Sequence, residues 1–138
     1  MRICIDASVL LNWVLPQAKS PEFDSSFEGL ILKHEACAPQ LLFAECTSVL
    51  RRYVHQRVIS HGEASDSLHR LLDLPVMIVQ TRRVHEQALD IAEALGHGKA
   101  YDAQYLAAAR ETGALLVTAD GGMHTNARRL SIESLLLA

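Results

Sequence analysis

The amino-acid sequence predicts a single α/β domain in which a mainly parallel central sheet is flanked by helices on both faces. Short apolar segments alternate along the chain with longer segments in which apolar residues recur at helical spacing. This alternation is typical of β-α-β units, whose strands run parallel because each connecting helix crosses over the sheet. A domain spanning residues 1–138, with 49% apolar and 21% charged residues, has the size and composition of one globular unit.

The chain begins with a short, β-branched segment that indicates a buried strand. This segment, Arg2–Ile5, carries Asp6 at its carboxyl end, where ligands gather in open α/β sheets. Ser8 is a good N-cap residue, so a short buried helix is expected after it, ended by Pro16. A loop is expected at residues 17–21.

The next unit supplies a strand and the longest predicted helix. Apolar residues at helical spacing predict a helix around residues 27–34, and Ala36–Ala38 is expected to be a short strand closed by Pro39. The long helix is predicted over residues 40–56. Glu45 lies in its second turn, among apolar neighbours.

A capping box at Ser60–Glu63 opens the following helix, and Pro75 ends it. The apolar stripe expected on this helix comprises Ala64, Leu68, Leu71 and Leu72. Val76–Val79 is predicted to be a buried strand. The spacing of apolar residues from 84 to 95 then predicts an amphipathic helix that Gly96 ends.

The last third of the chain repeats the arrangement found at its start. An alanine-rich helix is predicted at Tyr101–Thr112, with Asp102 in its first turn. Ala114–Thr118 is an apolar strand, and Asp120 follows two residues later. A short helix around residues 126–129 and an edge strand are expected to complete the domain. Asp6 and Asp120 are therefore expected at the same edge of the sheet.

Composition excludes several classes of protein. A net charge of −3 argues against a strongly basic nucleic-acid binder, but it is compatible with a nuclease whose metal ions meet the phosphate. Cys4, Cys37 and Cys46 are odd in number, lie in apolar surroundings and form no CxxC pair, so neither a disulfide framework nor a zinc site is expected. No apolar run approaches the ~20 residues of a membrane span. A soluble protein of the reducing cytoplasm is expected.

Four carboxylates follow or interrupt apolar segments, in contrast to the other acidic residues. They are Asp6, Glu45, Asp102 and Asp120. Clustered carboxylates repel, so a folded protein holds them together mainly where a divalent cation neutralises them. Mg²⁺ or Mn²⁺ is expected because these hard ions prefer oxygen ligands. Such a site can polarise a phosphate and activate water for phosphodiester hydrolysis.

Three of the four carboxylates also have an ordinary structural explanation. Asp102 could simply favour the dipole of its helix, and Asp120 could be a turn residue. Glu45 could face solvent if the helical phase differs by one residue. The joint pattern favours the metal site.

The sequence contains three arginine pairs whose planar guanidinium groups suit phosphate: Arg51–Arg52, Arg82–Arg83 and Arg128–Arg129. Arg51 and Arg52 follow Glu45 by one to two helical turns and are the better candidates for contacts with RNA. Arg82 and Arg83 lie between a strand and a helix, where an ordinary surface role is expected. The histidines show no HxH or HExxH spacing, which argues against a zinc enzyme.

Four ordered motifs in the sequence resemble those of PIN-domain ribonucleases, especially VapC-type toxins of bacterial toxin–antitoxin pairs. The motifs are Ile5–Ser8, Glu45 with Arg51–Arg52, Tyr101–Ala107 and Leu116–Asp120. The resemblance extends from Arg2 to at least Asp120. It implies that the four carboxylates bind Mg²⁺ or Mn²⁺, with Ser8 and Thr118 as auxiliary hydroxyls near the site. It also implies an endoribonuclease, an inhibitory antitoxin and a homodimer.

The sequence departs from this family pattern after the last aspartate. Many relatives carry a basic or bulky residue there, whereas Gly121 and Gly122 follow Asp120 in this chain. The glycines are expected to loosen the loop that holds Asp120. Asn126 and His124 could supply an extra polar group, but a solvated helix surface is the favoured interpretation for both.

The favoured function is a magnesium-dependent endoribonuclease that acts as a toxin and is inhibited by its antitoxin. A PIN-like module that binds RNA or protein without cleavage is the main alternative, and the intact acidic residues argue against it. A phosphotransfer domain is a second alternative. It is weakened because no second Asp follows Asp6 by two residues, and no Lys follows the last strand.

Overall fold

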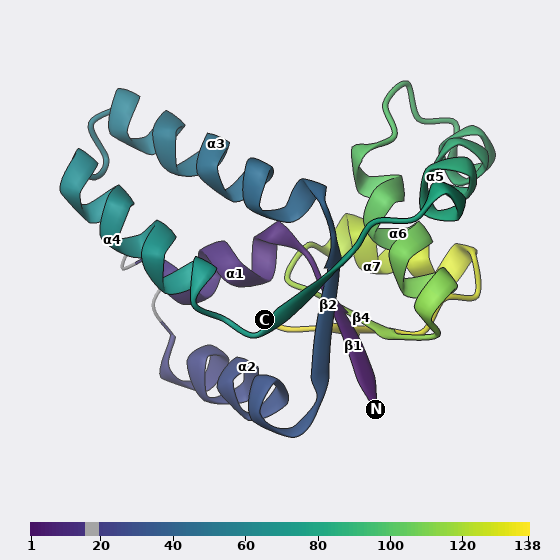
Figure 1. The fold of residues 1–138 in the computed structure, drawn as a ribbon, viewed down its shortest axis with the longest axis horizontal. Coiled ribbons are helices and arrows are strands. Elements are labelled where there is room, and N and C mark those ends of the chain that lie inside the picture. The colour runs from purple at the N-terminus through teal and green to yellow at the C-terminus, as the bar shows by residue number, and fades with distance from the viewer. Residues whose placement is uncertain (16–19) are drawn as a thin grey trace.

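A computed structural model describes residues 1–15 and 20–138 and contains one parallel sheet of five strands (Figure 1). Its spatial order is β3-β2-β1-β4-β5. The strands are β1 (Arg2–Ile5), β2 (Glu35–Pro39), β3 (Val76–Val79), β4 (Leu115–Thr118) and β5 (Ser134–Leu136). All pairs of neighbouring strands are parallel, as the alternation of elements predicted.

Helices cover both faces of the sheet (Figure 1). One face carries α1 (Ala7–Val14), α2 (Pro21–Lys33), α3 (Leu41–His55) and α4 (His61–Leu72). The other carries α5 (Arg82–Leu95), α6 (Tyr101–Thr112) and α7 (Gly121–Arg129). The face changes because right-handed crossovers first add β2 and β3 on one side of β1 and then add β4 and β5 on the other.

The centre of the sheet is therefore a topological switch point. β1 lies between β2 and β4. The chain leaves β1 toward the face that carries α1, and it leaves β4 toward the opposite face, which carries α7. Ile5 pairs with Val117, so Asp6 and Thr118 follow at adjacent strand ends. In open α/β sheets, ligands bind at the carboxyl ends of the strands beside this point.

The alanine-rich helix α6 forms the centre of the core. It contacts β1, β2 and β4. Its buried residues are Ala103, Tyr105, Leu106, Ala107, Ala108 and Ala109. Small side chains allow the helix to approach the sheet closely, so the position of Asp102 in its first turn is fixed by extensive packing.

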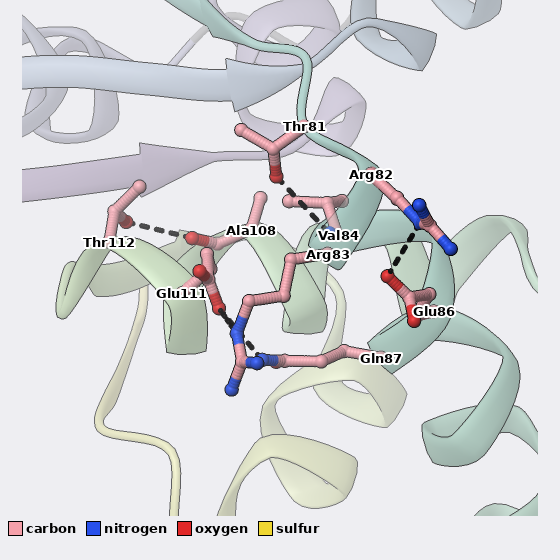
Figure 2. Close-up of polar contacts among 9 residues, drawn as sticks. All are labelled: Thr81, Arg82, Arg83, Val84, Glu86, Gln87, Ala108, Glu111 and Thr112. Atoms are coloured by element: carbon pink, nitrogen blue, oxygen red, sulfur yellow. Dashed lines mark hydrogen bonds and ion pairs between the residues drawn. The ribbon is translucent and has the colours of Figure 1, made fainter.

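Polar contacts also join α5 to α6 (Figure 2). The guanidinium of Arg83 and the amide of Gln87 both donate to Glu111 Oε2, at 3.0 and 2.7 Å. Arg82 forms an exposed ion pair with Glu86 at 3.4 Å. Arg82 and Arg83 thus have partners on the helical layer, in agreement with the surface role expected from the sequence.

Several sequence predictions of local structure need correction. Asp6, rather than Ser8, is the N-cap of α1, because its side chain accepts a hydrogen bond from Val9 N. Val76–Val79 forms a sheet edge instead of a buried strand, which leaves Met77 49% exposed. Leu72, at the last position of α4, is 50% exposed and does not join the buried stripe.

Helix boundaries also differ from the predicted ones in places. α2 already begins at Pro21, with Ser20 as its N-cap, and α7 already begins at Gly121. The predicted helix end at Pro16 and residues 17–19 of the predicted loop lie outside the described residues. No helix in the described ranges is both long and apolar enough to cross a membrane.

Candidate active site

Asp6 occupies the end of β1 and is almost completely buried, with 3% of its surface exposed. Its Oδ1 accepts hydrogen bonds from Ser8 Oγ at 2.6 Å and from Val9 N at 3.2 Å. Its Oδ2 accepts one from Thr118 Oγ1 at 2.5 Å. The carboxylate therefore caps α1 and joins the ends of β1 and β4.

The two hydroxyl groups beside Asp6 also hold the chain that leaves β4. Ser8 Oγ accepts from Ala119 N at 2.9 Å, and Thr118 Oγ1 accepts from Asp120 N at 3.0 Å. Both hydroxyls donate to Asp6, so each connects the carboxylate to the backbone that leads to Asp120. Ser8 and Thr118 thus contact one of the four candidate acids directly.

Asp120 is the N-cap of α7, and its Oδ1 accepts from Gly122 N at 2.8 Å. The two glycines were expected to loosen this segment, but they form the first turn of α7 and help to fix the aspartate. A Cβ added at Gly122 would lie 3.3 Å from Asp120 Oδ1, whereas one added at Gly121 would meet nothing within 4 Å. The absence of a side chain at Gly122 thus suits the position of the Asp120 carboxylate.

Glu45 and Asp102 approach from helices on opposite faces of the sheet. Glu45 is half-buried in the second turn of α3, and Asp102 is exposed in the first turn of α6. Helix α3 follows β2 directly and α6 packs on the central strands, so both residues lie toward the carboxyl edge.

The pKa values of the carboxyl groups connect these positions electrostatically. Burial is the main cause that raises the pKa of Asp6, and Asp120 raises it further. Burial also raises the pKa of Glu45, with further contributions from Asp102 and Asp6. Partial burial of its carboxylate and the charge of Asp120 raise the pKa of Asp102. Each of the four acidic residues therefore lies in the electrostatic field of at least one other.

The donor set suits a hard divalent ion. All four side chains offer carboxylate oxygens, and Glu45 Oε1 is buried without a hydrogen-bond partner among the described residues. Within residues 1–15 and 20–138, no group of three or more His, Cys, Asp or Glu side chains is arranged to hold a metal ion as it stands. An ion at this edge would therefore have to draw the carboxylates closer together.

Two further residues belong to the surroundings of the site and were not singled out from the sequence. Tyr105 is buried on α6, and its hydroxyl lowers the pKa of Glu45. His97, in the loop before α6, lowers the pKa of Asp102. Tyr105 follows Asp102 by three residues, and this helical spacing was the available signal. His97 lies in a glycine-rich loop, where the sequence gives no indication of its proximity.

The remaining candidates lie at the surface or have other partners. Arg51 and Arg52 are exposed on α3, and Arg52 lies over the ring of Tyr53 at 5.7 Å from its centroid. His124 is half-buried, and its Nδ1 makes a 2.7 Å hydrogen bond with Ser134 of β5. Asn126 is also half-buried, so neither residue has the fully solvated position favoured from the sequence.

Comparison with known proteins assigns this parallel α/β domain to a family. The family model of the PIN domain matches residues 3–129, and the chain therefore belongs to the PIN-domain family. This finding confirms the resemblance drawn from the sequence motifs and the predicted fold class.

Solved structures share the fold at low sequence identity. The VapBC2 structure from Rickettsia felis, bound to a DNA fragment from its promoter, matches with a TM-score of 0.76 and 12% identity, covering 100% of both chains. PAE2754 from Pyrobaculum aerophilum matches with a TM-score of 0.70 and 20% identity, covering 91% of this chain and 79% of the other. VapC20 from Mycobacterium tuberculosis is a toxin that cleaves the sarcin-ricin loop. It matches with a TM-score of 0.62 and 18% identity, covering 89% of this chain and 93% of the other. No curated protein matches the chain.

Proposed function

We propose that this PIN domain is a Mg²⁺- or Mn²⁺-dependent endoribonuclease and the toxin of a toxin–antitoxin pair. The observation that carries this proposal is the electrostatic coupling of four carboxylates, contributed by four separate segments, at the switch point of the sheet. Such coupling raises the free energy of the metal-free protein, and a divalent ion would relieve it.

The proposed ion would be held by the four carboxylates, which are Asp6, Glu45, Asp102 and Asp120. When bound, a divalent ion polarises a phosphate oxygen and increases the acidity of water. The protein itself holds Asp6 in place through three hydrogen bonds and holds Asp120 at the start of α7. These hydrogen bonds orient Asp6 and Asp120 before substrate arrives.

Arg51 and Arg52 are proposed to contact the phosphate backbone of the RNA. Both guanidinium groups are exposed on the same helix as Glu45, one to two turns away. Their positive charges would offset the repulsion between the acidic edge and the RNA backbone. Truncation of either residue would weaken RNA binding more than it would change the chemical step.

The proposed partners are a small antitoxin and a second copy of the chain, and the proposed location is the cytoplasm. A structure of similar fold supports an antitoxin, because the Klebsiella pneumoniae structure that matches with a TM-score of 0.63 and 14% identity is a toxin–antitoxin complex. Inhibition by a dedicated partner would suit a nuclease with a broad capacity to damage cellular RNA.

Cleavage of mixed cellular RNA by the purified chain tests the proposal. We expect fragments with Mg²⁺ or Mn²⁺ and none with a chelator. Asp102→Asn should abolish cleavage, whereas Asp90→Asn, at an exposed position of α5, should leave it unchanged. RNA binding without metal-dependent cleavage would instead favour the non-catalytic module, which the absence of a ready-made metal cluster among the described residues also suits.

A further inference from the structure

Tyr105 lies beneath the acidic edge and is one of the largest fully buried side chains of the protein. It is in the second turn of α6, three residues after Asp102, and its exposed fraction is 1%. Its backbone oxygen accepts a hydrogen bond from Cys4 Sγ of β1 at 3.7 Å. This contact joins the backbone of α6 to the strand that leads to Asp6.

The hydroxyl of Tyr105 is unusual because it is buried and has no hydrogen-bond partner among the described residues. A buried donor without an acceptor is unfavourable, since the group has lost its hydrogen bonds to water. Phenylalanine would fill the same space without this cost. The packing of the ring alone therefore does not account for the hydroxyl group.

The carboxylate of Glu45 lies beside the Tyr105 hydroxyl and has an oxygen that lacks a donor. Glu45 Oε1 is also buried without a hydrogen-bond partner in the described part of the chain. The Tyr105 hydroxyl lies within reach of the Glu45 carboxylate, because it lowers the pKa of that carboxyl as a hydrogen-bond donor. The two atoms are nevertheless not close enough or aligned well enough to form a regular hydrogen bond.

We propose that Tyr105 is a positioning residue whose hydroxyl donates a hydrogen bond to one oxygen of Glu45 while the other oxygen faces the divalent ion. The inference rests on the proposed metal-dependent function. A fixed donor behind a ligand carboxylate selects one orientation of the ligand and reduces the rearrangement that ion binding requires. Loss of such a partner typically weakens metal binding by about 10–100-fold.

The test measures Mn²⁺ affinity by calorimetry, together with melting temperatures in the presence and absence of Mn²⁺, on the full chain. Tyr105→Phe should lower the affinity by about tenfold or more. Its metal-free melting temperature should equal or exceed that of the wild type, because an unpaired buried hydroxyl has been removed. Tyr53→Phe is the matched control on α3 and should leave the affinity unchanged.

A double variant tests whether Tyr105 acts through Glu45. If it does, Tyr105→Phe combined with Glu45→Gln should bind Mn²⁺ no more weakly than Glu45→Gln alone. Additive losses would overturn the positioning role. An Mn²⁺ affinity of Tyr105→Phe equal to that of the wild type would also overturn it. The same holds if Tyr105→Phe lowers the melting temperature equally with and without Mn²⁺, because a purely structural role would produce that result. Absence of Mn²⁺ binding by the wild type would instead overturn the proposed metal-dependent function and the inference with it.

Discussion

Thr118 donates a hydrogen bond to Asp6 across 112 positions of sequence, and this contact joins the ends of the two central strands. The same Thr118 hydroxyl accepts from Asp120 N, so a single side chain links two of the candidate metal ligands. The geometry of the acidic edge is thus coupled to the pairing of β1 with β4.

Asp6→Asn should abolish RNA cleavage while leaving the metal-free protein as stable as the wild type or more stable. Asparagine is as good an N-cap as aspartate, and its oxygen can still accept from Val9 N and Ser8 Oγ. Its amide nitrogen can donate to Thr118 Oγ1 in place of the hydrogen bond that Asp6 Oδ2 accepts from that hydroxyl. Removing one charge should relieve repulsion worth about 1 kcal/mol. Mg²⁺ should then stabilise the wild type more than the variant, as thermal melts would show.

Asp6→Ala provides the contrast, because it removes the cap as well as the charge and should cost about 1 kcal/mol of stability or more. A sharp fall in the metal-free melting temperature of Asp6→Asn, together with intact cleavage, would assign Asp6 a capping role alone. The two substitutions therefore separate the structural role of this residue from the proposed catalytic one.

Thr118→Val should destabilise the protein by about 1–3 kcal/mol, because Asp120 N loses its acceptor and Asp6 loses a donor in a buried position. Valine has nearly the same shape, so lost packing contributes little. Urea unfolding measures the change. Thr125→Val, at an exposed position of α7, is the control and should alter stability by less than about 0.5 kcal/mol. Equal effects of the two substitutions would contradict the linking role of Thr118.

Gly122→Ala should weaken metal binding and cleavage more than Gly121→Ala. Both glycines lie in the first turn of α7, so both substitutions bring a similar gain in helix propensity, at most about 1 kcal/mol. The added methyl group at Gly122 alone would press against the Asp120 carboxylate. Mn²⁺ titration of the two variants provides the measurement. Equal Mn²⁺ affinities would show that the carboxylate adjusts without loss or that it is not a ligand.

The contribution of Asp6 to the free energy of unfolding of the metal-free protein should fall as pH rises from the acid range toward neutrality. Its folded-state pKa is raised above the ordinary 3.8, so the folded state binds the proton more tightly than the unfolded state. The destabilisation is absent below the unfolded-state pKa and complete above the folded-state value. Glu45 and Asp102 act in the same direction.

Melting temperatures across this range, compared between the wild type and Asp6→Asn, isolate the contribution of Asp6 from other titrating groups. The variant should show a smaller decline with rising pH. Saturating Mg²⁺ should reduce the decline in the wild type, because ion binding favours the ionised carboxylates. Parallel curves for the two proteins would contradict a raised pKa at Asp6.

Expression of the chain alone should slow the growth of its host, and co-expression of the proposed antitoxin should restore growth. Growth curves, with the Asp102→Asn variant as the inactive control, measure this effect. Harmless expression of a folded protein that binds metal would favour the non-catalytic alternative.

Periodicity was sufficient to predict most of the fold, and strand endings were sufficient to place Asp6 beside the end of β4. The metal-binding role of the four acidic residues stays a prediction. The sequence could not decide between Asp6 and Ser8 as the cap of α1, because both residue types cap helices well and lie two positions apart. The apolar composition of Val76–Val79 likewise does not reveal which strand lies at an edge. The sequence also could not show that the Tyr105 hydroxyl is buried without a hydrogen-bond partner in the described part of the chain. This property depends on tertiary packing, which the spacing of residues does not reveal.

The central position of β1 also affects when the proposed nuclease could become active during its own synthesis. β1 is made first, but its partner β4 emerges from the ribosome more than 100 residues later, as the pairing of Ile3 with Leu115 requires. At about 5–20 residues per second, several seconds separate the two strands. Asp6 and Asp120 meet only after β4 has joined the sheet, so we expect a nascent chain to lack nuclease activity until Asp120 has been made and β4 has paired with β1. A chain truncated before β4 should therefore neither cleave RNA nor slow growth.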